Sequence, residues 1–179
     1  MSCRLLSCRS RYSKGTCGKN SVSTFVLSWG GKEIFMAKFS KKYSCRVNVI
    51  QTNCVVTPCF EKKDGMLVSG CEVESSVWDT GATNTIISPA VVEALGLKPV
   101  SYTQIEGVGG IIDSSVYRIN IYVDGCLEFK SIEALSGDIG DYDLIIGMDI
   151  ITLGDFVISN KDNQTWFAFR YPSSDHIEF

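Results

Sequence analysis

The sequence predicts a mostly β protein with one or two short helices. Three observations support this fold class. Short segments with alternating apolar residues, such as YRINIYV, recur along the chain, and turn-forming residues such as Gly, Asn and Asp separate them. Only two segments have the pattern of a helix, and both are short.

Length and composition indicate one compact domain with extensions. The chain has 179 residues, 45% of them hydrophobic, and we find no internal repeat. No stretch approaches the roughly 20 apolar residues of a membrane span, and the N-terminus is too polar for a signal peptide. We therefore expect a soluble, cytoplasmic protein that makes no membrane contact.

The first half of the chain is predicted to consist mainly of strands. Residues 1–23, which precede them, are expected to be loosely attached. Two apolar runs hinged at Gly30 and Gly31 predict a hairpin over 25–39. A strand is expected at 46–50, and two more flank the turn-prone segment 61–65. A short helix follows, which Ser88 caps, Pro89 begins and Gly96 ends.

The second half is again dominated by strands. Two long strands within 99–125 meet near the glycines at 107–110, and another strand covers 126–135. A buried strand at 142–147 leads into one or two helical turns at 148–154. A final hairpin over 155–171 turns at 160–163.

The charge is divided unevenly along the chain. Residues 1–46 carry +9 and residues 47–179 carry −12, giving the net charge of −3. A basic arm of this kind can bind nucleic acid or an anionic membrane. We favour an arm that lies on its own acidic domain or stays solvated, because residues 1–20 hold one aromatic residue, Tyr12, and so offer no stacking platform.

The eight cysteines do not have the spacing of a metal site. Seven lie within the first 71 residues, without the paired ligand spacing of zinc sites, and the single histidine, His176, stands near the end of the chain. We therefore expect free thiols, several of them buried in strands, with no metal and no cofactor.

The segment SVWDTGATNTIIS at 76–88 carries the functional signal. An apolar strand runs into Asp79, turns through Thr80, Gly81 and Ala82, and returns at once to apolar residues. This arrangement predicts an acid held where water is scarce. Asp-Thr-Gly alone is also an ordinary surface turn, because Asp and Gly are good turn formers.

Two later features accompany the turn. Gly107, Val108, Gly109 and Gly110 form a glycine-rich hairpin tip, and Ile145, Ile146 and Gly147 end an apolar strand before the second helix. Together with Asp79–Ala82, these segments resemble the motifs of the retropepsin-like aspartic protease family and follow one another in the same order. The resemblance covers about 45–172, so we divide the chain into a basic Cys-containing segment 1–44, a protease domain 45–172 and a tail 173–179.

The resemblance implies a closed β-barrel, which is half of an acid protease. It assigns catalysis to Asp79, the active-site loop to Thr80–Ala82, a flap over the substrate to 107–110 and support of the site to 145–147. The sequence holds one Asp-Thr-Gly motif, so the implied enzyme is a homodimer that hydrolyses a polypeptide with two Asp79 carboxylates. Several family members carry an acid at the position of Thr83 and an arginine at that of Met148, and both charges are absent here.

The alternative from another class is a catalytically silent peptide-binding or dimerisation module, with the basic arm as its contact. The intact Asp79 argues against it. Asp149 could contact the site, but we favour a cap or dipole partner of the second helix. Trp78 is expected in the core, whereas the stripe of Trp166, Phe167 and Phe169 fits either the core or a dimer surface.

Overall fold

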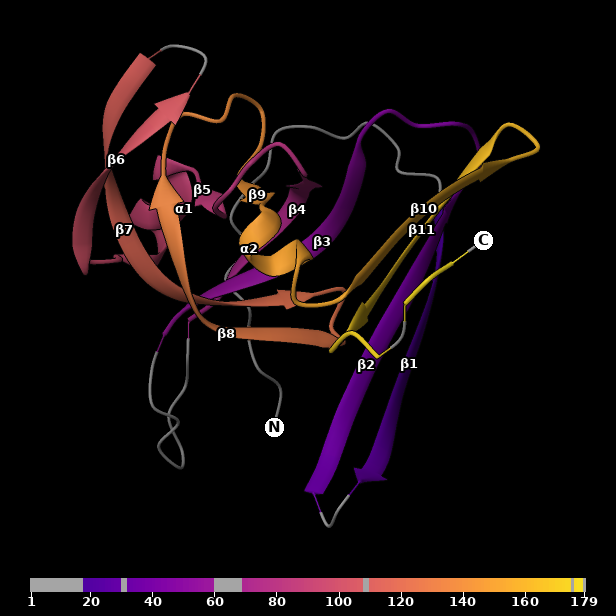
Figure 1. Cartoon of the computed structure of the whole chain (residues 1–179). Coiled ribbons are helices and arrows are strands. Elements are labelled where there is room, and N and C mark those ends of the chain that lie inside the picture. Colours follow the sequence, from indigo (N-terminus) through magenta and orange to yellow (C-terminus); the bar gives the residue numbers. More distant parts are fainter. Residues whose placement is uncertain (1–17, 30–31, 60–68, 108–109, 175, 179) are drawn as a thin grey trace.

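The computed structural model describes residues 18–29, 32–59, 69–107, 110–174 and 176–178. The fold class is confirmed as mostly β with two short helices (Figure 1). The strands are β1 (Gly18–Trp29), β2 (Lys32–Tyr43), β3 (Ile50–Pro58), β4 (Cys71–Trp78), β5 (Ile86–Ile87), β6 (Ser101–Gly107), β7 (Gly110–Val123), β8 (Leu127–Ser136), β9 (Leu144–Ile146), β10 (Asp155–Lys161) and β11 (Gln164–Tyr171). The helices are α1 (Pro89–Leu95) and α2 (Met148–Ile151).

Six strands close into a barrel. Strands β3, β4, β9, β5, β8 and β7 are neighbours in that order, and β3 also pairs with β7, which completes the ring. β4 pairs in parallel with β9, and β5 in parallel with β8. The β6 strand pairs with the first half of β7, so these two project from the barrel as a hairpin (Figure 1).

A second sheet combines the two ends of the chain. Its four strands lie in the order β1-β2-β11-β10, so β2 of the basic half is hydrogen-bonded to β11 near the C-terminus. The sheet carries Phe39, Phe167 and Phe169 into the core, where they pack around Trp78 with ring centroids 4.9–6.4 Å apart. Of the aromatic stripe at 166–169, Phe167 and Phe169 are therefore in the core, whereas Trp166 is on the surface and 44% exposed.

Most local expectations are confirmed. Residues 18–29 pair with 32–43 as the expected hairpin, although its turn at Gly30 and Gly31 lies outside the described residues. Ser88 caps α1 by accepting a hydrogen bond from the Val91 N–H, and Gly96 ends the helix at φ 58°. No described helix is long and apolar enough to cross a membrane.

Two boundaries are wrong. Residues 18–23, which we expected to be loosely attached, belong to β1, because they pair with β2. The strand expected at 46–50 begins only at Ile50, because the preceding loop is held by side chains: the Val47 N–H donates to the Thr165 hydroxyl.

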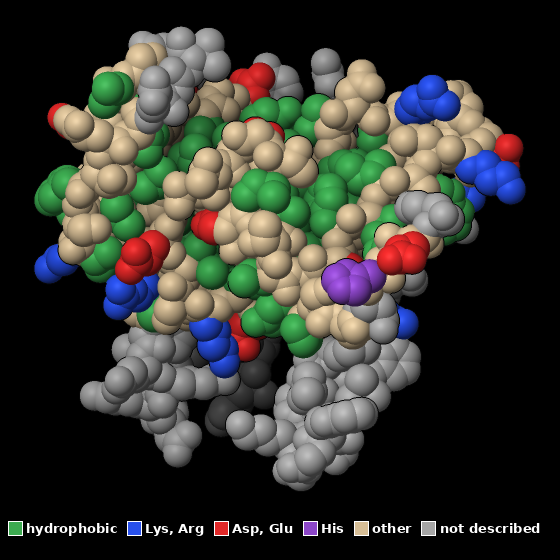
Figure 2. Space-filling view, viewed as in Figure 1, with side chains coloured by type: hydrophobic (Ala, Val, Ile, Leu, Met, Phe, Trp, Pro, Cys, Tyr) green, Lys and Arg blue, Asp and Glu red, His purple; other side chains and the backbone are tan. Residues whose placement is uncertain are grey.

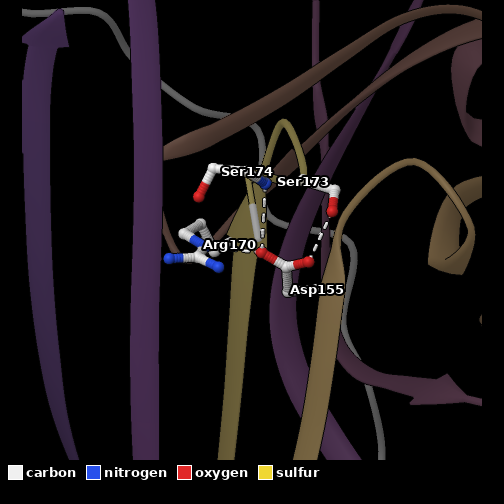
Figure 3. Close-up of polar contacts among 4 residues, drawn as sticks. All are labelled: Asp155, Arg170, Ser173 and Ser174. Carbon is white, nitrogen blue, oxygen red and sulfur yellow. Dashed lines mark hydrogen bonds and ion pairs between the residues drawn. The ribbon is translucent and has the colours of Figure 1, made fainter. Parts of the chain in front are cut away.

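Asp155 fastens the end of the chain to the second sheet (Figure 3). Its carboxylate accepts hydrogen bonds from the Ser173 hydroxyl and the Ser174 N–H and pairs with the Arg170 guanidinium. Burial alone would raise the pKa of Asp155, but the hydrogen bonds from Ser173 and Arg170 outweigh it and hold the pKa below its ordinary value. The charged form of Asp155 is therefore favoured by folding.

This anchor predicts a pH dependence of stability. A carboxylate whose pKa is depressed by folding contributes stability above its unfolded pKa, about 3.9, and loses it as pH falls through the folded value. We expect Asp155→Asn to lower the free energy of unfolding at pH 7 by about 1–3 kcal/mol. The difference from wild type should narrow as pH falls from about 5 to 3, measured by urea unfolding. A difference that stays constant over this range would contradict the assignment.

Candidate active site

The β4 strand brings Asp79 to the surface at the end of a buried run. Trp78 is 5% exposed and lies in the aromatic core, whereas Asp79, Thr80 and Gly81 are exposed. The Asp79 N–H donates to the Ile146 carbonyl over 3.0 Å, which continues the parallel pairing of β4 with β9. The sheet therefore fixes the backbone of Asp79 while its side chain faces outward.

The next residues form a tight turn closed by the aspartate itself. The Gly81 N–H donates to Asp79 Oδ1 over 2.8 Å, and the Ala82 N–H donates to the Asp79 carbonyl over 3.2 Å. Our expectation that water is scarce around Asp79 is wrong for a single chain, because the loop stands outside the barrel. A side-chain bond of this kind also occurs in ordinary surface turns, so the turn alone does not define a site.

The loop is also held against β9 and α2. The Met148 N–H donates to the Ala82 carbonyl over 2.8 Å, and the Asp149 N–H donates to the Thr83 carbonyl over 3.2 Å. Gly147 is required at this crossing, because a Cβ there would lie 2.5 Å from the Asn84 carbonyl carbon. The structure thus brings together the predicted loop and the predicted support at 145–147.

Thr85 and Asp149 lock the same crossing through side chains. Asp149 Oδ1 accepts from the Thr85 hydroxyl over 2.8 Å, and Oδ2 accepts from the Thr85 N–H over 3.0 Å. The Thr85 hydroxyl in turn accepts from the Gly147 N–H over 3.3 Å. Thr85 is fully buried, so each of these polar groups depends on the others for a partner.

These two residues are what sequence reasoning missed. We expected Asp149 to serve its own helix, and it does accept a hydrogen bond from the Ile150 N–H. Its main partner, however, is the loop that carries Asp79. The signal available in the sequence was the presence of a small hydroxyl residue shortly after the motif and of an acid two residues after Gly147.

The glycine-rich hairpin is present as β6 and β7, with Gly107 paired to Gly110. Val108 and Gly109, at the predicted flap tip, lie outside the described residues. Ile112 lies on the same side of β7 as the buried Ser114 and Val116, yet it is 53% exposed. The described part of this hairpin makes no hydrogen bond to the Asp79 loop, so a flap role remains a prediction.

The described cysteines are Cys45, Cys54, Cys59, Cys71 and Cys126, and all five are free thiols. Burial raises the pKa of the Cys54 thiol to about 12, which keeps this thiol protonated and unreactive. Among the described residues, no three His, Cys, Asp or Glu side chains lie together as a metal ion would require.

A closed barrel with one Asp-Thr-Gly loop braced against a glycine-ended strand defines the acid-protease class of domain. The sequence model of the aspartyl protease family matches residues 65–150. This match confirms the resemblance seen in the sequence. No curated protein matches the chain.

Two solved structures are similar to the chain. The protease of simian foamy virus (mac) is 21% identical, with a TM-score of 0.37, over 56% of this chain and 89% of that one. A retropepsin-like aspartic protease from Rickettsia conorii is 12% identical, with a TM-score of 0.42, over 86% of this chain and 96% of that one.

The contact between Thr85 and Asp149 predicts energetic coupling. Thr85→Val and Asp149→Ala each leave buried polar groups without a partner, so each should lower the free energy of unfolding by about 1–3 kcal/mol. In a double-mutant cycle we expect a coupling energy of about 0.5–3 kcal/mol. As a control, Thr85→Val and Asp155→Asn should add to within about 0.5 kcal/mol. Additive effects in the first pair would contradict the interpretation.

Proposed function

We propose that the chain is an aspartic endopeptidase whose active site forms between two copies. The observation that carries the proposal is the exposed Asp79 carboxylate, at the end of a buried strand, in a loop tied by its backbone to β9 and α2. The match of residues 65–150 to the aspartyl protease family supports the same reading. An ordinary surface turn does not require such bracing.

The chemistry needs a second carboxylate. Amide hydrolysis without a metal or a covalent intermediate requires a base that takes a proton from water and an acid that protonates the leaving nitrogen. Two carboxylates about 3 Å apart hold one proton between them and fill both roles. The ionised carboxylate takes a proton from water as the water oxygen bonds to the carbonyl carbon. The protonated carboxyl group then gives its proton to the nitrogen, and the C–N bond breaks. The chain has one Asp-Thr-Gly motif, so the second carboxylate comes from Asp79 of another copy.

Exposed hydrophobic side chains are available for such a pairing. Leu153, which follows α2, is 40% exposed, and Ile158 on β10 is 45% exposed. Hydrophobic side chains are visible across the face that carries α2 and β10 (Figure 2). An isologous dimer buries the same surface on both copies at once. The dimer would also shield Asp79 from water, which the single chain does not.

The remaining roles follow from this arrangement. Thr80 would brace the two loops against each other, and Gly81 would let the substrate backbone approach without a side chain in the way. The β6–β7 hairpin would close over an extended polypeptide and pair with it as an added strand. The site supports at 145–147 hold the loop from behind.

The catalytic role of Asp79 is tested by substitution. Asp79→Asn cannot share a proton, so we expect cleavage of a peptide library between about pH 4 and 7 to fall by at least about 10²- to 10⁴-fold. Asp138→Asn is a matched control, because Asp138 closes a similar exposed turn by accepting from the Gly140 N–H. Equal cleavage by wild type and Asp79→Asn would overturn the proposal, and peptide binding without any cleavage would favour the silent module.

The shared site is tested by mixing subunits. If each site needs two Asp79 side chains, only wild-type homodimers are active. An equal mixture of wild type and Asp79→Asn that has exchanged subunits should then retain roughly a quarter of the activity of wild type at the same total protein concentration. A self-sufficient monomer would retain roughly half. Sedimentation of the active protein should show a dimer, and activity per molecule should fall on dilution. Half activity in a mixture shown to exchange would contradict the dimer.

A further inference from the structure

The outer face of the four-stranded sheet joins the basic half of the chain to the C-terminal hairpin. Phe39, Phe167 and Phe169 point into the core, so the residues between them on β2 and β11 point the opposite way. We call this opposite side the outer face. It is remote in sequence from the Asp79 loop, and the proposed peptidase does not use it.

The register sets the side chains of the outer face in rows. Ser40, Ala168 and Val157 form a row of small side chains across β2, β11 and β10. On one side stands the row of Lys42, Trp166 and Ser159, and on the other the row of Lys38, Arg170 and Asp155. A hollow of about 550 Å³ lies over the row of small side chains, and Ile177 of the tail also lines it.

Trp166 is the aromatic feature of this face. It is 44% exposed, and Lys42 Nζ lies 4.7 Å from the ring centroid. Lys161 lies two residues after Ser159 on the same side of β10 and is exposed. Lys and Arg side chains are visible at the end of the sheet where β10 turns into β11 (Figure 2). Trp166 thus lies on a strand between β2, which carries Lys42, and β10, which carries Lys161. An exposed aromatic ring flanked by cations can stack with the bases of an anionic nucleic-acid chain.

The charge distribution favours an anionic partner over the chain's own arm. Residues 1–46 hold ten Lys or Arg and one Glu, and β1 and β2 come from this part. In the backbone register, Lys19 of β1 is the partner of Lys42. Residues 1–17 carry four basic residues and no acid, so their charge has the same sign as that of Lys42 and Lys161.

We propose that the outer face binds single-stranded nucleic acid, with a base stacked on Trp166 and phosphates beside Lys42 and Lys161. A duplex hides the faces of its bases, so it gains only the charge contacts. An acidic polypeptide would also gain those contacts but carries no regular series of planar rings for Trp166. Residues 1–20 lack a stacking platform, and the fold supplies one by placing Trp166 next to the basic half.

The test measures binding of the full chain to a fluorescent oligothymidylate of about 20 nucleotides by anisotropy at low salt. Trp166→Ala should weaken binding about 5- to 150-fold, which corresponds to the loss of one stacked base, whereas Trp166→Phe should retain most of the affinity. Lys42→Ala should reduce the slope of log K against log salt by about 0.7. Lys130→Ala is the charge-matched control, because Lys130 is exposed and lies on the barrel strand β8 beside Glu128.

Several outcomes would overturn the proposal. The proposal is wrong if wild type does not bind the oligonucleotide. It is also wrong if wild type, Trp166→Ala and Lys42→Ala bind with equal affinity, because that result would assign binding to residues 1–17. Binding to vesicles of anionic phospholipid without binding to the oligonucleotide would make the face a membrane contact instead. Lys161→Ala replaces an exposed side chain, so it tests the face even if Trp166→Ala fails to fold. Its loss of affinity should exceed that of Lys130→Ala.

Discussion

The crossing of the Asp79 loop with β9 and α2 is the constraint on which the candidate site depends. Here two chain segments more than 60 residues apart approach so closely that only glycine fits at position 147. The Thr85 hydroxyl both donates to Asp149 and accepts from Gly147, so one buried atom links all three residues. Because Thr85 and Gly147 are buried, their polar groups cannot leave the arrangement without losing a partner. The loop that carries Asp79 is thus held rigidly on the side that contacts β9 and α2, whereas the Asp79 side chain is exposed.

The second sheet supports this crossing from the other side. Trp78 immediately precedes Asp79, and its ring packs on Phe167 and Phe169 of β11. Phe39 of β2 belongs to the same cluster and is 2% exposed. The N-terminal hairpin therefore contributes a phenylalanine to the core beneath the site.

Local chemistry made much of the fold predictable. The cap at Ser88, the stop at Gly96 and the alternating strands depend on neighbouring residues, and the structure has them where the sequence indicated. The pairing of β2 with β11 joins residues 124 to 134 positions apart in the sequence, for which no local pattern exists. The same limit hid Thr85 and Asp149, whose importance lies in their contact. Trp166 is exposed while Phe167 and Phe169 are buried because side chains alternate along a strand. The sequence does not reveal which side of the strand faces the core, so it could not predict which of these residues is exposed.

The exposure of Asp79 links the fold to the proposed dimer. A single exposed carboxylate has no second acid with which to share a proton. The rigid crossing holds the backbone of Asp79 in place, so a two-fold partner would meet the acid in one defined position. Little of the loop would then have to be ordered on association, which reduces the entropic cost of forming the site. The bracing by Thr85, Gly147 and Asp149 and the exposure of Asp79 are therefore complementary, because the proposed dimer would require a rigid and open half-site of each subunit.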